Sequence, residues 1–244
     1  ADKAHQGHLR YSGEPYIDHL VESAKILLGF EPDLLSIQAC LLYDVLEETD
    51  ITRDMIAEHF GEELAELLES MKNLAIVKLR IDDINTEKWR GLFLAMAKDI
   101  RVVFVKLSAR LHNMRTLEFV PEEKRERIAR ETLLLHAAIA SRLGMYQVKS
   151  ELEDLCFRYL YPEHYEKLSA QLSNIHEKSE EYMDFAISQI EELLKNEDVE
   201  FLEVRGRMKH RWSIYQKLLA KGNIELAEIH DLFALRIILP DKSR

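Results

Sequence analysis

The chain contains 244 residues, 47% of them hydrophobic and 32% charged, which is typical of a soluble globular protein with one large core or two modest ones. Its net charge of −11 argues against broad non-specific binding to DNA, other nucleic acids or anionic membranes, but allows a local basic pocket for a phosphorylated ligand. No apolar run approaches the ~20 residues of a membrane span, and no signal peptide opens the printed sequence. Cys40 and Cys156 both lie in apolar runs, so we expect buried thiols and a cytoplasmic protein.

Helical spacing of the apolar residues dominates the chain as far as position 195. Asp33 and Thr52 precede helical runs and are predicted N-caps, while Gly61 and Gly144 are predicted to end helices. Residues 78–86 are polar enough for a mobile loop. In chain order, the predicted helices are 16–28, 33–49, 52–60, 62–74, 92–119, 121–143, 145–161 and 165–194.

The segment 92–119 carries two patterns. Residues 100–105 are rich in β-branched side chains, as a buried strand would be, but apolar residues recur with a helical period over five turns. Because that period extends further than a strand needs, we predict a helix.

The stretch Leu41–Thr49 places three acidic residues in one of the predicted helices. Asp44, Glu47 and Glu48 share one face at i, i+3 and i+4, and the apolar residues lie on the other face. This is the geometry of a carboxylate cluster at a pocket. It is also the polar face of any amphipathic helix, and these nine residues by themselves favour that simpler interpretation.

The pattern changes near Asn196. Residues 198–204 alternate polar and apolar side chains, which predicts a half-buried strand, and the basic segment 205–211 is predicted to form a turn. Residues 212–220 are predicted to be helical, and residues 233–239 form the next predicted strand. Because a two-stranded fragment is marginal by itself, we expect a second domain to begin here and to be cut short.

Several segments resemble the long RelA/SpoT homologues, the stringent-response enzymes that make and degrade (p)ppGpp. In the first part of the chain they are Arg10–His19, Leu41–Thr49, Lys106–Thr116 and Arg142–Tyr146. The opening of that family's synthetase domain is matched by Gly206–His210, Ser213, Ile214, Tyr215 and Lys217, and its metal-binding strand by Asp231, Leu232 and Arg236. The resemblance implies a mainly α fold. It consists of a helical HD-type hydrolase domain (1–145), a helical connector (146–195) and the start of an α+β nucleotidyltransferase-like synthetase domain (196–244).

In that family the hydrolase domain removes the 3′-pyrophosphate of (p)ppGpp with a manganese ion. By resemblance, His19 and Asp44 match two of the metal ligands. Glu47 and Glu48 match the acidic pair that positions or activates water, with Glu48 in place of the usual aspartate.

Two ligand positions of the family are lost in this chain. Tyr43 stands where a histidine is expected and Ala109 where a distant aspartate is expected. A hard divalent ion needs several oxygen or imidazole donors, and hydrolysis depends on the metal to generate hydroxide. A neutral phenol with a pKa near ~10 is a poor substitute for imidazole, and alanine supplies no donor. We therefore predict a hydrolase fold without hydrolase activity.

The pocket is still predicted to take a guanine nucleotide. Arg10, Asn113 and Thr116 match positions that line the family's substrate site, and an arginine suits phosphate recognition. The alternative is that Asn113 and Thr116 are ordinary polar residues of a helix and Arg10 a surface residue of a turn. His5 and His112 are predicted to be packed or surface histidines rather than ligands.

The family's second domain transfers pyrophosphate from ATP to the 3′-hydroxyl of GTP or GDP. By resemblance, Arg207, Lys209 and Lys217 clamp the ATP phosphates, Ser213 lies close by, and Asp231 binds Mg²⁺. A solvated basic surface is the alternative for this cluster. The family's catalytic residues further downstream are absent from the printed sequence, so this chain by itself is not expected to synthesise (p)ppGpp.

The sequence thus predicts the N-terminal enzymatic half of a (p)ppGpp synthetase, a GTP diphosphokinase, with a degenerate hydrolase site. Guanine nucleotides and ATP are the expected partners, and ribosome or tRNA contacts are expected only through parts outside this chain. Two alternatives stay open. The first domain could act as a non-catalytic scaffold that restrains the synthetase through residues 145–194, or it could retain Mn²⁺-dependent hydrolysis through His19, Asp44, Glu47 and Glu48.

Overall fold

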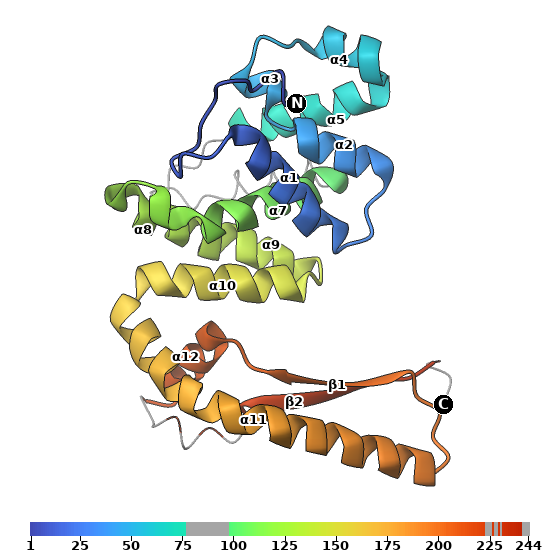
Figure 1. Ribbon diagram of the computed structural model, residues 1–244, viewed down its shortest axis with the longest axis vertical. Helices are drawn as coiled ribbons and strands as arrows, with labels where there is room; N and C mark the ends of the chain where they lie inside the picture. The colour runs from blue at the N-terminus through green and yellow to red at the C-terminus, as the bar shows by residue number, and fades with distance from the viewer. Residues whose placement is uncertain (77–97, 223–225, 227–228, 230, 241–244) are drawn as a thin grey trace. The chain divides into compact units, whose positions relative to one another are not determined.

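The computed structural model describes residues 1–76, 98–222, 226, 229 and 231–240 (Figure 1). The loop predicted over 78–86 and the first residues of the helix predicted from 92 lie outside this described part. The chain divides into two compact units, Ala1–Cys156 and Phe157–Arg244. Among the described residues, no helix combines the length and the apolar character needed to cross a membrane.

The regular elements described in the first unit are all helices, apart from an isolated bridge between Leu9 and Pro15, which confirms the predicted fold class for this part of the chain. A 3₁₀ turn at Leu117–Phe119 follows the helix that ends at Arg115. The helices are α1 (Tyr16–Leu28), α2 (Leu34–Leu42), α3 (Val45–Glu48), α4 (Arg53–Phe60), α5 (Glu62–Ile76), α7 (Arg101–Arg115), α8 (Glu122–Glu131), α9 (Ala137–Arg142) and α10 (Tyr146–Leu160).

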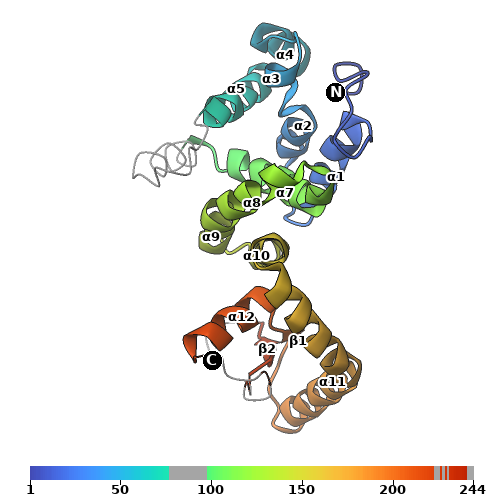
Figure 2. The ribbon, with the colours of Figure 1, turned by 90° about the vertical axis from the view of Figure 1, so that its left-hand side faces the viewer.

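The core of this unit lies among α1, α2, α5 and α7 (Figures 1 and 2). Helix α1 packs against both α2 and α7, and α4 packs against α5. Each leucine that is fully buried on these faces stabilises the unit by about 1.5–3 kcal/mol. The buried residues include Leu20, Leu27, Ala39, Leu68 and Val105.

The predicted helix ends are largely confirmed. The Asp33 carboxylate accepts the Ser36 backbone N–H at 2.8 Å, and the Thr52 hydroxyl accepts the N–H of Met55 at 3.4 Å. Gly144 has φ of 74°, a conformation that other residues adopt at a steric cost, and it separates α9 from α10. The segment 101–115 is a helix, as its long apolar period predicted.

The helix predicted to run unbroken over 33–49 is wrong. Helix α2 ends at Leu42, and α3 begins only at Val45. The break turns both Tyr43 and Asp44 inward, where they are 6% and 9% exposed and meet polar partners from α1. A buried hydroxyl and a buried carboxylate need such partners, and this requirement outweighs two more residues of regular helix.

The helix predicted over 121–143 is also interrupted. Residues Thr132–His136 form a π turn between α8 and α9. The Thr132 hydroxyl donates to the carbonyl of Ile128 at 2.7 Å, and Thr132 is fully buried. The wider turn rotates the apolar face of α9 relative to that of α8, which a strict 3.6-residue pattern does not anticipate.

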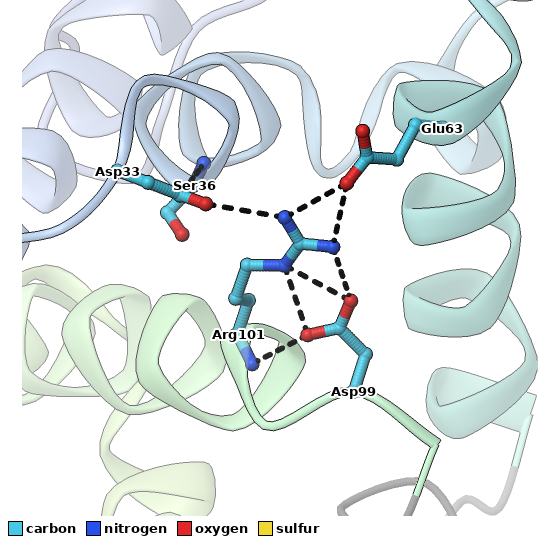
Figure 3. Close-up of polar contacts among 5 residues, drawn as sticks. All are labelled: Asp33, Ser36, Glu63, Asp99 and Arg101. Carbon is cyan, nitrogen blue, oxygen red and sulfur yellow. Dashed lines mark hydrogen bonds and ion pairs between the residues drawn. The ribbon is translucent and has the colours of Figure 1, made fainter.

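Arg101, the first residue of α7, joins three elements (Figure 3). Its guanidinium donates to Asp33 at 3.2 Å, to Glu63 at 3.1 Å and to Asp99 at 2.7 Å. Because Asp33 caps α2 and Glu63 lies in α5, these bonds fix the start of α7 relative to both helices. Helix α7 carries several residues of the candidate site.

The second unit contains the long helix α11 (Pro162–Asn196), strand β1 (Glu203–Met208), helix α12 (Arg211–Ala220) and strand β2 (Phe233–Ile238). The strands pair antiparallel, with Arg205 opposite Arg236. Helix α11 packs along β1 (Figure 2). A Cβ on Gly206 would lie 2.2 Å from Sδ of Met183 in α11, so any larger residue here requires the Met183 side chain to move.

The observed register corrects two predictions: the strand over 198–204 and the basic turn over 205–211. β1 begins at Glu203 and continues through Arg205 and Arg207 to Met208. Asp198 has φ of 53° just after α11, which prevents a strand from starting there. The pairing with β2 therefore sets the strand limits, and the alternation in the preceding residues does not.

Candidate functional site

The candidate site in the first unit is a chain of hydrogen bonds that crosses from the N-terminal turn to the junction of α2 and α3. Arg10 Nη1 lies 2.7 Å from Nδ1 of His112, and this nitrogen lies 2.7 Å from Nδ1 of His19. Nε2 of His19 lies 2.7 Å from the hydroxyl of Tyr43. Helix α1 supplies His19, α7 supplies His112, and Tyr43 is the C-cap of α2.

The donors and acceptors of this chain follow from the chemistry of its ends. A guanidinium can only donate, so Nδ1 of His112 is the acceptor for Arg10. His19 contacts the same nitrogen through Nδ1 and the Tyr43 hydroxyl through Nε2, and in a neutral imidazole one ring nitrogen donates while the other accepts. Both ring nitrogens of His19 are thereby engaged within the protein.

The electrostatics keep these groups uncharged. Burial, with the nearby charge of Arg10, lowers the pKa of His19 from 6.5 to about 3. Burial and the Asp44 carboxylate raise the pKa of Tyr43 well above 10. His19 is therefore a neutral imidazole at pH 7, and Tyr43 is a neutral phenol.

Asp44 is engaged in a second contact. The hydroxyl of Tyr16 donates to its Oδ2, and the ring of His5 stacks on Tyr16 with centroids 4.8 Å apart. Burial raises the pKa of Asp44, and the hydrogen bonds from Tyr16 and Tyr43 partly offset this effect. The two side chains that resemble metal ligands, His19 and Asp44, are thus both bonded to tyrosine hydroxyls.

These residues do not fit a divalent metal ion. A ligand nitrogen must present a free lone pair, but Nε2 of His19 is engaged by the Tyr43 hydroxyl at 2.7 Å and Nδ1 by His112 at 2.7 Å. Ala109, at the ligand position where the family has a distant aspartate, carries only a methyl group and is 4% exposed. Within the described ranges, no three His, Cys, Asp or Glu side chains are grouped in a way that could hold a metal.

The predicted acidic pair lies next to a lysine. The Glu47 carboxylate is 4.0 Å from Nζ of Lys106, and burial raises the pKa of Glu47. Glu48 is exposed. Of the three predicted carboxylates, only Asp44 is buried, so they do not form one cluster in a closed cavity.

The predicted substrate-binding residues do come together. Arg10 Nη2 donates to Oδ1 of Asn113 at 2.7 Å and to the hydroxyl of Thr116 at 3.1 Å. Arg10 and Thr116 line a cavity of about 330 Å³. It is lined by Leu9, Arg10, Tyr11, Ser12, Tyr16, Thr116, Phe119 and Val120. The Arg10 guanidinium, predicted to bind a ligand, instead donates to the side chains of Asn113 and Thr116.

The sequence reasoning missed three residues of this site. His112, predicted to be only packed or a surface residue, lies at the centre of the hydrogen-bond chain. Tyr16 and Lys106 received no role. The helical spacing from Tyr16 to His19 and from Lys106 to Ala109 is i, i+3 in each case, which places them on the same helical faces and could have identified them.

The predicted synthetase residues of the second unit gather around one carboxylate. Lys209 and Lys217 both form ion pairs with Asp231, and they lower its pKa. Arg207 lies in β1. The hydroxyl of Ser213, in α12, is 2.9 Å from Nε2 of His210. The structure therefore brings the charged ends of Lys209, Lys217 and Asp231 together.

Comparisons with known proteins find one family model and several similar proteins. The family model described as HD domain matches residues 1–146. The chain is 43% identical over 242 residues to a GTP pyrophosphokinase of Myxococcus xanthus, covering 98% of the chain and 32% of that protein.

Two further relatives show the same coverage. A guanosine-3′,5′-bis(diphosphate) 3′-pyrophosphohydrolase of Haemophilus influenzae is 39% identical, over 98% of this chain and 35% of that protein. The bifunctional (p)ppGpp synthase/hydrolase SpoT of Escherichia coli is 39% identical, over 99% of this chain and 34% of that protein. The chain spans about a third of the length of these curated relatives.

Proposed function

We propose that the whole protein makes (p)ppGpp and that its HD site does not hydrolyse (p)ppGpp. The premise is that this chain belongs to the HD domain family and is the N-terminal region of a RelA/SpoT-type protein. The similar proteins bear both synthase and hydrolase names, so their names do not decide between the two activities. The contacts of the site favour the loss of hydrolysis.

The observation that carries this proposal is the 2.7 Å contact between Nε2 of His19 and the hydroxyl of Tyr43. A metal-dependent hydrolase needs an open coordination position and ligands with free lone pairs to generate hydroxide near pH 7. Here a neutral phenol engages Nε2 of one remaining ligand, His19, and Tyr16 donates to the other, Asp44. The pocket holds a closed hydrogen-bond network in place of a metal site.

The synthetic half of the proposal rests on the second unit. Mg²⁺ in phosphate-transfer sites is often held by one or two carboxylates together with the substrate's own phosphates, and it neutralises those phosphates when bound. Asp231 fits that requirement as a single carboxylate. Lys209 and Lys217, which now contact Asp231, would turn to the phosphates of ATP, and Arg207 would meet the same phosphates from β1.

The direct test is turnover of ppGpp by the purified chain with Mn²⁺, followed by chromatography of the nucleotide products. We expect no release of pyrophosphate above a control without protein. Manganese-dependent hydrolysis at a rate typical of enzymes would contradict the proposal and would favour the alternative of a residual hydrolase. A parallel assay of the full-length protein with ATP and GTP or GDP tests the synthetic half.

A specific contact favours an additional regulatory role for the first unit. Arg115, the last residue of α7, forms a bidentate pair with Glu151 of α10, with N–O distances of 2.6 and 2.8 Å. Helix α7 carries Asn113 and His112 of the pocket, so the pair links the pocket to α10. If the first unit restrains synthesis, deleting the residues before Met145 from the full-length protein changes its synthetase rate. An unchanged rate would argue against the scaffold.

A further inference from the structure

Helix α12 begins without the side-chain cap that fixes the starts of α2 and α4. The side chain of its N-cap, His210, makes no capping hydrogen bond, and its first residue is Arg211. A positive charge at a helix N-terminus opposes the helix dipole. Contacts with other elements must therefore hold the start of α12. This helix carries Ser213 and Lys217, two residues assigned by resemblance to the ATP side of the synthetase.

Aromatic rings hold one face of α12. Tyr215 stacks on Phe157 with ring centroids 4.6 Å apart, and Trp212 stacks on Tyr161 with centroids 5.9 Å apart. The rings of Tyr161 and Tyr215 are also close, at 5.6 Å. Such spacings are those of favourable aromatic pairs. Phe157 lies in the last turn of α10 and Tyr161 is the N-cap of α11, so these four residues form an aromatic corner around the start of α12.

Arg211 adds a second attachment beside the aromatic corner. Its Nε donates to the hydroxyl of Ser169 in α11 at 3.1 Å, and its guanidinium carbon lies 5.7 Å from the centroid of the Tyr165 ring. A guanidinium placed over an aromatic face is attracted by it. These contacts offset the unfavourable charge at the start of α12, and they attach that start to α11, against which α12 packs (Figure 2).

The attached face of α12 is opposite the face that the synthetase motif uses. Trp212 and Tyr215 are one turn apart and are 8% and 7% exposed. Ser213 and Lys217 are also one turn apart, and with 3.6 residues per turn they lie on the other side of the helix. Lys217 pairs there with Asp231. The rotation of α12 about its own axis, which the aromatic corner fixes, thus decides where this second face points.

We propose that the aromatic corner is a positioning element for ATP: it sets the rotation of α12 and thereby directs Ser213 and Lys217 toward the phosphates of the nucleotide. The inference rests on the proposed synthetic function and adds residues outside its charged set. Phe157 and Tyr161 act through the rings of α12, so they are positioning residues. A disturbed corner is expected to weaken the binding of ATP and not that of the acceptor nucleotide, because only ATP is assigned to this helix.

The experiment measures synthetase kinetics of the full-length protein with Tyr161→Ala, Tyr161→Phe and the matched control Tyr182→Ala. Tyr161 is 39% exposed, so its truncation costs less than that of a buried ring, and Tyr182 is 73% exposed in α11. We expect Tyr161→Ala to raise KM for ATP at least fivefold, with KM for GTP or GDP within twofold, and Tyr161→Phe to restore the value for ATP.

A merely structural role predicts a different result. Loss of folded protein lowers the amount of active enzyme, and hence the apparent kcat, without changing KM for ATP. An unchanged KM for ATP in Tyr161→Ala, an equal rise in both KM values, or the same rise in Tyr182→Ala would overturn the inference.

A second measurement decides the inference even if the full-length protein makes no (p)ppGpp. Hydrogen exchange read by mass spectrometry on this chain follows the amides of α12, with those of α7 as the internal reference. We expect exchange in α12 to become at least fivefold faster in Tyr161→Ala and to stay unchanged in Tyr182→Ala. Unchanged exchange in α12 of Tyr161→Ala would overturn the inference. Faster exchange there, together with no synthesis by the unaltered protein, would support the hold of the corner on α12 and defeat the proposed synthetic function instead.

Discussion

Replacing Tyr43 with phenylalanine removes one oxygen from the centre of the pocket and keeps the volume of the ring. The hydroxyl lies 2.7 Å from Nε2 of His19, and the two residues are 6% and 2% exposed. A buried polar nitrogen left without its hydrogen-bond partner costs about 1–3 kcal/mol, so we expect the free energy of unfolding to fall by roughly 2 kcal/mol. Loss of the contact between Tyr43 and Asp44 acts in the same direction.

The assay is urea unfolding followed by circular dichroism at pH 7 in chelator. Tyr146→Phe serves as the control, because Tyr146 is 56% exposed and a surface change of this kind stays within about 0.5 kcal/mol. If Tyr43→Phe costs no more than Tyr146→Phe, the hydroxyl does not hold His19. The reasoning that the network has replaced a metal site would then be refuted.

Three further outcomes follow from the same structure. Because the pKa of His19 is lowered from 6.5 to about 3 in the folded chain, its contribution to stability is full above pH ~6.5 and is lost towards pH ~3, at up to about 1.4 kcal/mol per pH unit. The stability difference between the chain and His19→Gln should therefore shrink on acidification, and a constant difference would exclude this titration. Gly206→Ala should destabilise the second unit by about 1–3 kcal/mol through its clash with Met183, and adding Met183→Ala should recover part of the loss in thermal unfolding. Arg101→Met should cost about 1 kcal/mol at low salt and less in 1 M NaCl, since the pairs with Asp33 and Glu63 are partly exposed; a cost independent of salt would point to packing instead.

Local signals in the sequence were sufficient for most helix ends. Asp33 and Thr52 cap the helices they were predicted to cap, because a side-chain oxygen three residues before an amide is a purely local arrangement. Gly61 and Gly144 end helices through positive φ values, again a property of one residue. Where a single residue or its near neighbours decide the structure, the sequence predicts it.

Prediction failed where distant residues decide. The break before Val45 follows from partners that Tyr43 and Asp44 find on α1, some 25 residues away in sequence, as the bonds to His19 and Tyr16 show. The limits of strand β1 are set by its pairing with β2, and the alternation of polar and apolar residues in 198–204 does not predict that pairing. Long-range pairing overrides local pattern in both cases.

The sequence predicted which residues form the candidate site but not the hydrogen bonds between them. The resemblance identified His19, Asp44, Arg10, Asn113 and Thr116, and the structure brings all five into one region. The sequence could not reveal that Arg10 bonds to Asn113 and Thr116. That contact depends on how the turn after residue 8 folds back onto α7. The roles of these residues in catalysis or binding stay predictions.

The most direct test of the account compares the unaltered chain with the variant that carries both Tyr43→His and Ala109→Asp. Calorimetry measures Mn²⁺ binding, and ppGpp turnover is followed on the same samples. We predict no binding and no turnover in the unaltered chain, with both present in the variant, since Tyr43→His frees Nε2 of His19 and adds an imidazole, and Ala109→Asp adds a carboxylate. Tight Mn²⁺ binding and turnover in the unaltered chain would contradict the central claim that this network has replaced the metal site.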